Sequence, residues 1–306
     1  MIQYFIRHSV GETFQKVVMP PSKAVWVVGS NVTQEDLDGL ERRYGLDGNI
    51  LRDVLDTHEL PRVEANHAGL YVFVRVARRT THGELVTSPL LLAVKGSVFV
   101  SLSAGEHGEH LDFATKVPIR ANDALGLLLA MFASVVGEYD ELVIQTAKFV
   151  KDTGRRLKTH EVTTADFIHF VTIESNLNEY HMNLSNMLVV AERLYETIDS
   201  PSERESLGDI LLHIRQNLVA IDSYGQNVVS IRNAYSTIAD NALNQRMKTL
   251  TALTVLIALP NVFYGMYGMN VALPFQDQPL AYVAILGFSV LLILTVYAVA
   301  KRLKVF

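Results

Sequence analysis

The spacing of apolar residues divides the chain into a first part with strand-like runs and a longer part with helical periodicity. The strand-like runs are rich in Val, Leu and Phe and occupy residues 24–29, 69–77, 88–94 and 97–103. Helical patterns at 34–44 and 48–56 lie between the first two runs. Strands that alternate with helices are typical of an α/β domain, so we expect residues 1–120 to form one.

From residue 122 onward, apolar residues recur at intervals of three and four, which is the spacing of one helix face. Residues 121–200 are expected to form a helical hairpin region that ends at Asp199-Ser200-Pro201-Ser202, where a proline suits the first turn of a new helix. The next helical pattern covers 201–270 with a lapse near Gly225, and one helix of that length spans roughly 100 Å. We expect a single long stalk helix, with two helices and a bend near Gly225 as the alternative.

Two apolar segments near the C-terminus have the length of membrane-spanning helices. Residues 250–269 and 281–300 contain no Asp, Glu, Lys or Arg. Each has about 20 residues, which an α-helix needs to cross a hydrocarbon core of about 30 Å. We therefore expect the stalk to continue into a first transmembrane helix, followed by an outer loop at 271–279 and a second transmembrane helix in 280–306.

Basic residues flank these two segments and are absent from the loop between them. The flanking residues are Arg246 and Lys248 before the first segment, and Lys301, Arg302 and Lys304 after the second. The loop 271–279 contains neither Lys nor Arg. The positive-inside rule therefore predicts a multi-pass protein of the inner or plasma membrane, with both termini in the cytoplasm.

Composition excludes several other classes of function. Subtracting the flanking charges and Asp277 from the totals of 27 basic and 32 acidic residues leaves 22 and 31 in residues 1–245, a net charge of −9. An acidic soluble part argues against a nucleic-acid partner. The absence of cysteine excludes disulfides and thiolate metal sites.

No motif of an enzyme or of an organic cofactor is present. The chain has no Gly-rich phosphate loop ending in Gly-Lys-Ser/Thr, and His160-Glu161 lacks the second histidine of a zinc-protease helix. The run Gly105-Glu106-His107-Gly108-Glu109-His110 has zinc-binding residue types, but its glycines favour a surface turn. We therefore expect the chain not to be an enzyme.

The first apolar segment carries polar residues that a lipid anchor does not need. Stepping back from Asn270 by three or four residues gives one helix face, made of Asn261, Ala258, Thr254, Leu250, Met247 and Asn244. Polar groups inside a membrane are costly unless they face water or a partner. The second segment is nearly uniform in Ala, Val, Leu and Ile. The first helix is thus expected to line a pore that the second surrounds, although polar residues can also mediate helix packing.

The run Tyr267-Gly268-Met269-Asn270 ends the first apolar segment, and in this position it resembles the signature of the CorA family of divalent-cation channels. A second stretch, Glu59-Leu60-Pro61-Arg62-Val63-Glu64 followed by Tyr71-Val72-Phe73-Val74, is similar to the family's soluble domain. Lys248, the long helix and the basic tail also match. The resemblance covers nearly the whole chain and implies a homopentameric funnel with an α+β cytoplasmic part.

The resemblance also implies roles for individual residues. Tyr267, Gly268, Met269 and Asn270 would form the outer selectivity filter, with the Asn270 amide holding hydrated Mg²⁺. Asn244, Met247, Leu250, Thr254, Ala258 and Asn261 would line the pore, and Met247 with Leu250 would form its apolar constriction. Cytoplasmic Mg²⁺ would also close the pore through Asp209, with Glu106 and Glu109 as candidate partners.

The expected function is passive, potential-driven uptake of hydrated Mg²⁺, with Co²⁺ and Ni²⁺ as further candidate ions. The expected partners are divalent cations, the lipid bilayer and further copies of the chain. A zinc transporter of the ZntB type and a non-conducting membrane-anchored helical scaffold remain alternatives. Two departures from the family pattern bear on the site: the loop 271–279 offers only Asp277 where relatives carry glutamate, and Pro260-Asn261 lies one position out of the usual register.

Overall fold

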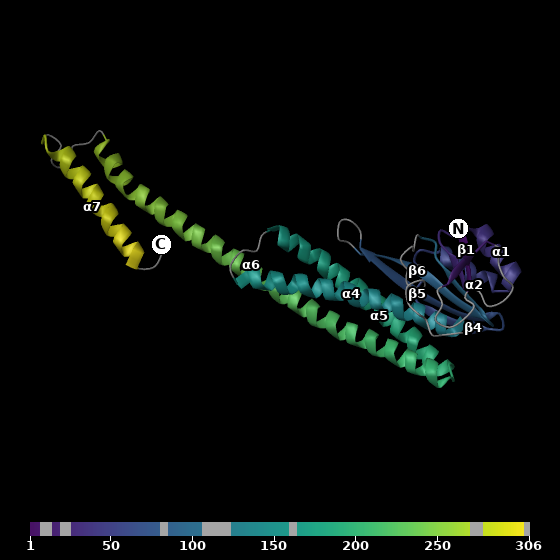
Figure 1. Cartoon of the computed structure of the whole chain (residues 1–306). Helices are drawn as coiled ribbons and strands as arrows, with labels where there is room; N and C mark the ends of the chain where they lie inside the picture. Colours follow the sequence, from purple (N-terminus) through teal and green to yellow (C-terminus); the bar gives the residue numbers. More distant parts are fainter. Residues whose placement is uncertain are drawn as a thin grey trace. The chain divides into compact units, whose positions relative to one another are not determined.

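The computed structural model describes residues 1–6, 14–18, 26–79, 85–105, 124–158, 164–269 and 278–302 of the chain. The chain divides into two compact units, Met1–Ile231 and Arg232–Phe306. Figure 1 shows the chain and labels several of its helices and strands.

The first unit contains a mixed sheet whose seven described strands lie in the order β2-β1-β3-β7-β6-β5-β4. The strands are β1 Ile2–Ile6, β2 Gln15–Val17, β3 Trp26–Gly29, β4 Arg62–Asn66, β5 Gly69–Arg79, β6 Leu85–Lys95 and β7 Val98–Leu102. Strands β3 and β7 are parallel, and the other neighbouring pairs are antiparallel. The four apolar runs found in the sequence coincide with β3, β5, β6 and β7, so these strand predictions are confirmed.

Successive residues of a strand point to opposite faces of the sheet, and each face of this sheet has its own apolar core. One core joins Val27, Tyr71, Phe73, Leu91 and Val100 to the helices α1 (Gln34–Tyr44) and α2 (Gly48–Arg52). The other core joins Trp26, Val28, Val72, Val74 and Phe99 to the long helices. The short segment η1 (Asp53–Leu55) follows α2. Helices therefore cover both faces of the sheet, as an α/β architecture requires.

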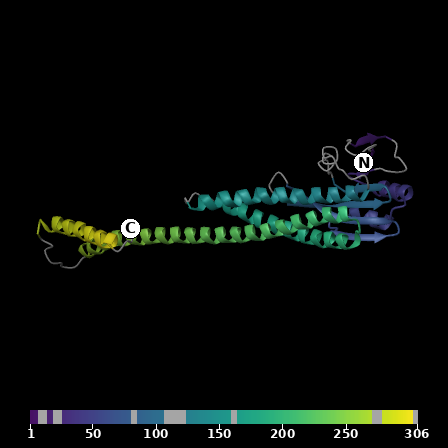
Figure 2. The same cartoon turned by 60° about the horizontal axis from the view of Figure 1, so that its bottom comes forward.

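Three long helices complete the first unit: α4 (Ala124–Lys158), α5 (Thr164–Thr197) and the N-terminal part of α6 (Pro201–Tyr267). They run alongside one another in Figure 2 and share one apolar core. Helix α6 begins at Pro201, as predicted, and continues through Gly225 without interruption. The alternative of two helices that meet near Gly225 is therefore wrong. An interior glycine costs a helix only about 1 kcal/mol, and burial of the neighbouring Ile221 and Val228 offsets that cost.

Buried polar contacts tie the sheet to these helices. The guanidinium of Arg75, on β5, donates to the carbonyl oxygens of Thr57 (3.1 Å), Glu59 (2.7 Å) and Thr87 (3.0 Å). The Tyr139 hydroxyl of α4 donates to the Arg75 carbonyl at 3.0 Å. Burial raises the pKa of Tyr139, so this hydroxyl stays protonated and remains a donor. One buried arginine thus holds the loop before β4 against β5 and β6.

The second unit contains the C-terminal part of α6 and helix α7 (Ala281–Arg302). Among the described residues, α6 and Tyr282–Val299 of α7 are the two helices long and apolar enough to cross a membrane. They pack through Phe263 of α6 and Phe288 of α7, whose ring centroids lie 5.0 Å apart. Most other apolar side chains in this unit are exposed. An exposed apolar surface of this extent is the surface that a bilayer or a further subunit would cover.

Candidate functional site

The part of α6 from residue 252 to 263 has one face that is shielded within the second unit. The side chains that are not fully exposed in this interval are Ala252, Leu256, Leu259, Pro260 and Phe263. Their spacing of three and four residues puts them on one side of the helix, which contacts α7 through Phe263. Helix α7 therefore covers a single face of α6.

The predicted pore residues lie on the other side of the same helix. All six are exposed: Asn244, Met247, Leu250, Thr254, Ala258 and Asn261. Because an α-helix turns by about 100° per residue, the centre of this set lies roughly 180° from the centre of the shielded set. The polar face of α6 is therefore turned away from α7 and does not serve to pack the two helices of this chain together.

Hydroxyl groups on α6 are arranged so that their oxygen atoms remain available as acceptors. The Thr254 hydroxyl donates to the carbonyl oxygen of Leu250, and the Thr251 hydroxyl donates to that of Met247, both at 2.9 Å. A hydroxyl oxygen keeps lone pairs after its hydrogen is used. Thr254 can thus offer oxygen to a cation or to its water without leaving an unpaired donor.

Pro260 interrupts the hydrogen-bond ladder of α6 in the middle of this segment. It has no backbone N–H, so the carbonyl of Leu256 loses its usual helical donor. Pro260 itself is buried, and the next residue, Asn261, is exposed on the predicted pore face. The structure thus places the polar amide beside a weakened turn, on the side away from α7.

The predicted filter begins at Tyr267, the last residue of α6, and continues beyond the helix. The backbone N–H of Gly268 donates to the carbonyls of Tyr264 (3.0 Å) and Gly265 (3.2 Å), and that of Met269 donates to Met266 at 3.2 Å. A Cβ atom on Gly268 would lie 3.4 Å from the Tyr264 oxygen, at the near limit of ordinary van der Waals contact. The C-terminal end of a helix carries partial negative charge, which favours a nearby cation. Asn270 and the loop 271–277, including Asp277, lie outside the described residues.

The predicted regulatory aspartate lies far along α6 from this end. Asp209 is exposed near the start of the helix. Its candidate partners Glu106 and Glu109 lie outside the described residues, as do His107, His110 and His160-Glu161. Within the described residues, no three His, Cys, Asp or Glu side chains group so as to hold a metal ion. Within the described part of one chain, Asp209 is therefore not part of a group of three or more such side chains.

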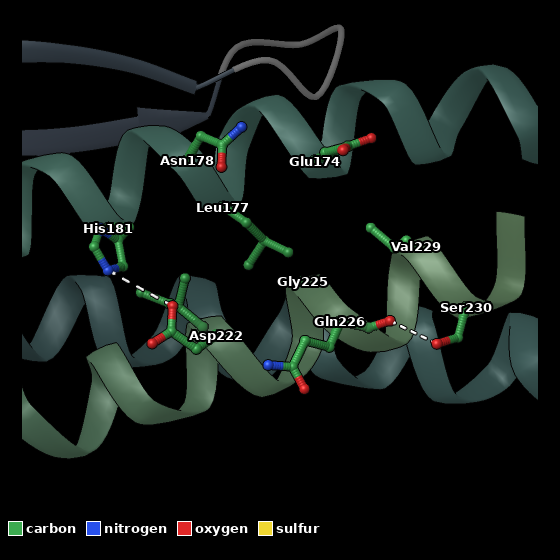
Figure 3. A pocket seen from close by; sticks show the side chains of 10 residues that line it. Glu174, Leu177, Asn178, His181, Asp222, Gly225, Gln226, Val229 and Ser230 are labelled. Carbon is green, nitrogen blue, oxygen red and sulfur yellow. Dashed lines mark hydrogen bonds and ion pairs between the residues drawn. The ribbon is translucent and has the colours of Figure 1, made fainter. Parts of the chain in front are cut away.

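A feature that sequence analysis missed is a groove between α5 and α6 in the first unit. Its volume is about 770 Å³, and Glu174, Asn178, His181, Asp222 and Gln226 are among the residues that line it. Figure 3 shows His181 of α5 facing Asp222 of α6 across the groove. These two residues belong to no motif and are distant in sequence, so only the packing of the two helices reveals their proximity.

An α/β domain, a long helix that ends in an apolar segment and a second apolar helix define a two-span membrane protein. A family model described as CorA-like Mg²⁺ transporter protein matches residues 21–302, and the chain therefore belongs to this family. The chain is 22% identical over 291 residues to the cobalt/magnesium transport protein CorA of Methanocaldococcus jannaschii, covering 92% of this chain and 90% of that protein.

Solved structures share the fold at low sequence identity. The complete CorA magnesium transporter of Methanocaldococcus jannaschii has a TM-score of 0.83 at 18% identity, covering 99% of this chain and 98% of that one. Full-length CmaX has a TM-score of 0.75 at 15% identity, with 96% and 97% covered. The ZntB cytoplasmic domain of Vibrio parahaemolyticus has a TM-score of 0.63 at 8% identity, with 78% and 98% covered.

These findings confirm the predicted family and the predicted fold class of the chain. The chain is a divalent-cation transporter of the CorA type, not an enzyme, and it is a membrane protein. A non-conducting scaffold, one of the alternatives from the sequence, does not fit a family of transporters. The roles of individual pore and filter residues remain predictions.

Proposed function

We propose that the chain is one subunit of a homopentameric channel that takes up hydrated Mg²⁺ passively, driven by the membrane potential. The observation that carries this proposal is the division of α6 into two faces. One face is shielded beside α7, and the opposite face presents Asn261, Thr254 and Asn244. Several copies of such a helix around a common axis would enclose a path lined with oxygen atoms, with α7 outside.

The chemistry of the predicted filter suits an ion that keeps its water. Mg²⁺ gives up water reluctantly and is commonly bound through its hydration shell. The amide oxygen of Asn270 is a dipole rather than a full charge, so a ring of such groups holds the hydrated ion without trapping it. The partial negative charge at the end of α6 adds to this attraction. Selectivity in this proposal comes from the size and charge of the hydrated ion.

Both termini are placed in the cytoplasm in this proposal, because the basic residues flank the two spans on one side. A divalent ion then gains roughly 4.6 kcal/mol per 100 mV of inside-negative potential as it enters. This energy suffices to drive uptake without ATP. Met247 and Leu250, both exposed and apolar, would form the constriction that closes the path by excluding water.

Regulation by cytoplasmic Mg²⁺ is the second part of the proposal. Among the described residues of one chain, Asp209 belongs to no group of three or more His, Cys, Asp or Glu side chains that could hold a metal ion. A site that includes Asp209 would therefore take its remaining ligands from a neighbouring subunit. Binding there would hold subunits together when internal Mg²⁺ is plentiful, which would keep the pore closed.

Transport by the purified protein in liposomes tests the proposal. A Mg²⁺-sensitive dye inside the liposomes reports uptake under an imposed inside-negative potential, for the unmodified protein and for Asn270→Ala. The matched control is Asn241→Ala, because Asn241 is exposed on α6 and lies about 130° around the helix from the centre of the predicted pore face. We expect uptake to be lost only in Asn270→Ala. Zinc uptake that follows a pH gradient, without Mg²⁺ uptake, would instead favour the ZntB-type alternative.

A further inference from the structure

The groove between α5 and α6 carries a pair of side chains of the types that ligate metal ions. Nε2 of His181 lies 3.6 Å from Oδ1 of Asp222, and the two side chains come from different helices of the first unit. The side chains are 46% and 63% exposed, so both are accessible to ions in solution. Figure 3 shows them facing each other at one end of the groove.

The distance between these two atoms fits a shared metal ion better than a direct hydrogen bond. A nitrogen–oxygen hydrogen bond is normally about 2.7–3.2 Å long. Two ligands that each lie about 2.1 Å from a tetrahedral ion are separated by roughly 3.4 Å. An ion between Nε2 and Oδ1 would therefore need only a small movement of either side chain.

The surroundings leave room for water and offer further oxygen atoms. Gly225 follows Asp222 by three residues, and apart from its chain neighbours and the nearby backbone of its own helix, no atom lies within 4 Å of the position where a Cβ would project. Asn178 and Gln226 line the same groove, and their amide groups carry oxygen acceptors. A volume of about 770 Å³ accommodates several water molecules beside a bound ion. The two protein ligands can thus be supplemented without a third acidic residue.

We propose that this groove binds a transition-metal divalent cation such as Co²⁺, Ni²⁺ or Zn²⁺, with Nε2 of His181 and a carboxylate oxygen of Asp222 as its protein ligands. An imidazole ligand suits these ions, whereas Mg²⁺ prefers oxygen ligands alone. The site therefore differs in ligand type from the predicted filter, which offers amide oxygen and no imidazole. The proposal rests on the groove alone and does not depend on the proposed conduction of Mg²⁺.

A bound ion would join α5 to α6 at Asp222. Helix α6 continues from that residue without interruption to Tyr267. Occupancy of the groove by a transition metal would thus act on the helix that also carries the candidate pore residues. This gives the chain a way to respond to Co²⁺, Ni²⁺ or Zn²⁺ that differs from its response to Mg²⁺.

Binding of Co²⁺ to the full-length chain in detergent tests this site. Visible absorption reports the loss of octahedral water coordination when Co²⁺ binds an imidazole nitrogen in a site of lower coordination number. The variants are His181→Ala and Asp222→Asn, and the matched control is His213→Ala, an exposed histidine on α6 outside the groove.

We expect both groove variants to lose one bound Co²⁺ per chain, or to bind it at least about tenfold more weakly. His213→Ala is expected to match the unmodified protein. Circular dichroism checks that each variant retains its helices, and His181, Asp222 and His213 are all exposed. Equal Co²⁺ binding by all four proteins, or an equal loss in His213→Ala, would overturn the proposal. Failure of Mg²⁺ uptake in liposomes would leave it intact.

Discussion

Phe263 of α6 meets Phe288 of α7 edge to face, with ring centroids 5.0 Å apart and ring planes at 77°. An aromatic pair of this geometry contributes about 0.5–1.5 kcal/mol beyond the burial of its area. Its main consequence is the orientation of α6, because it identifies the face that α7 covers. The polar residues of the candidate pore lie on the opposite face, and several predictions about them can be tested separately.

Replacing an apolar residue of the predicted constriction is expected to make the pore leak. An asparagine at position 250 would attract water where Leu250 excludes it, so Leu250→Asn should raise Mg²⁺ uptake several-fold at high internal Mg²⁺. Uptake into dye-filled liposomes measures this. Leu253→Asn is the control, since Leu253 is similarly exposed but lies off the candidate pore face. Equal leakage in both variants would argue against a constriction at Leu250.

Removing the predicted regulatory carboxylate should weaken inhibition by internal Mg²⁺. In Asp209→Ala a ligand is lost, so currents should persist at millimolar Mg²⁺ concentrations that close the unmodified channel. Patch recording from reconstituted protein, with Mg²⁺ varied on the cytoplasmic side, provides the measurement. Glu141→Ala, which removes an exposed acid from α4, should leave inhibition unchanged. Unchanged inhibition in Asp209→Ala would remove this residue from the regulatory site.

The buried Arg75 should be important for the stability of the α/β unit. Arg75→Ala leaves the carbonyls of Thr57 and Glu59 without the donor they have in the structure. Hydrogen bonds from a charged group are involved, so the expected loss is about 3 kcal/mol of unfolding free energy. Denaturant unfolding of the full chain in detergent measures it. Arg78→Ala, on the exposed part of the same strand, should change stability by less than about 0.5 kcal/mol.

The contribution of Tyr139 to the stability of the fold should depend on pH. Its hydroxyl is buried, donates to the Arg75 carbonyl and has a raised pKa, so folding favours its protonated form. This contribution is fully present below the ordinary tyrosine pKa of about 10 and is lost as the pH rises above it. Tyr139→Phe should therefore cost about 1 kcal/mol at neutral pH. In alkaline solution the variant should approach and then exceed the unmodified protein in stability.

The measurement is the free energy of unfolding of the unmodified protein and of Tyr139→Phe across the alkaline pH range. It checks whether the stability advantage of the unmodified protein falls as the pH rises. Other tyrosines titrate in both proteins, so only the difference between the two is informative. A difference that stays constant with pH would show that Tyr139 does not resist ionisation in the folded chain.

The sequence predicts the elements of this fold better than their contacts. Strands β5 and β6 appear as apolar runs because both of their faces are buried, and the break at residues 199–202 locates the start of α6. Strand β4 has no such run, since it is a polar edge strand that is recognised only by its pairing with β5, Arg62 opposite Phe73. The lapse in periodicity near Gly225 left a bend open as an alternative to one long helix, and the structure shows one continuous helix there.

For the candidate site too, the sequence predicts which residues share a helix face, whereas the packing of that face is known only from the structure. Periodicity alone groups Asn261, Ala258 and Thr254 on one face of α6, but it does not reveal where α7 packs. That information comes from the structure, through the shielded residues around Phe263. The proximity of His181 and Asp222 likewise depends on the packing of α5 against α6, which no local pattern encodes.

The chain contains no cysteine, so a single introduced thiol reports water access on either face of α6 without a background signal. Two alanines form a matched pair: Ala258 on the candidate pore face and Ala252 on the face beside α7. The measurement is Mg²⁺ uptake into liposomes before and after a membrane-impermeant, positively charged thiol reagent. We expect the reagent to block uptake by Ala258→Cys and to leave uptake by Ala252→Cys unchanged. Block of Ala252→Cys alone, or of neither variant, would contradict a pore lined by the face of α6 that points away from α7.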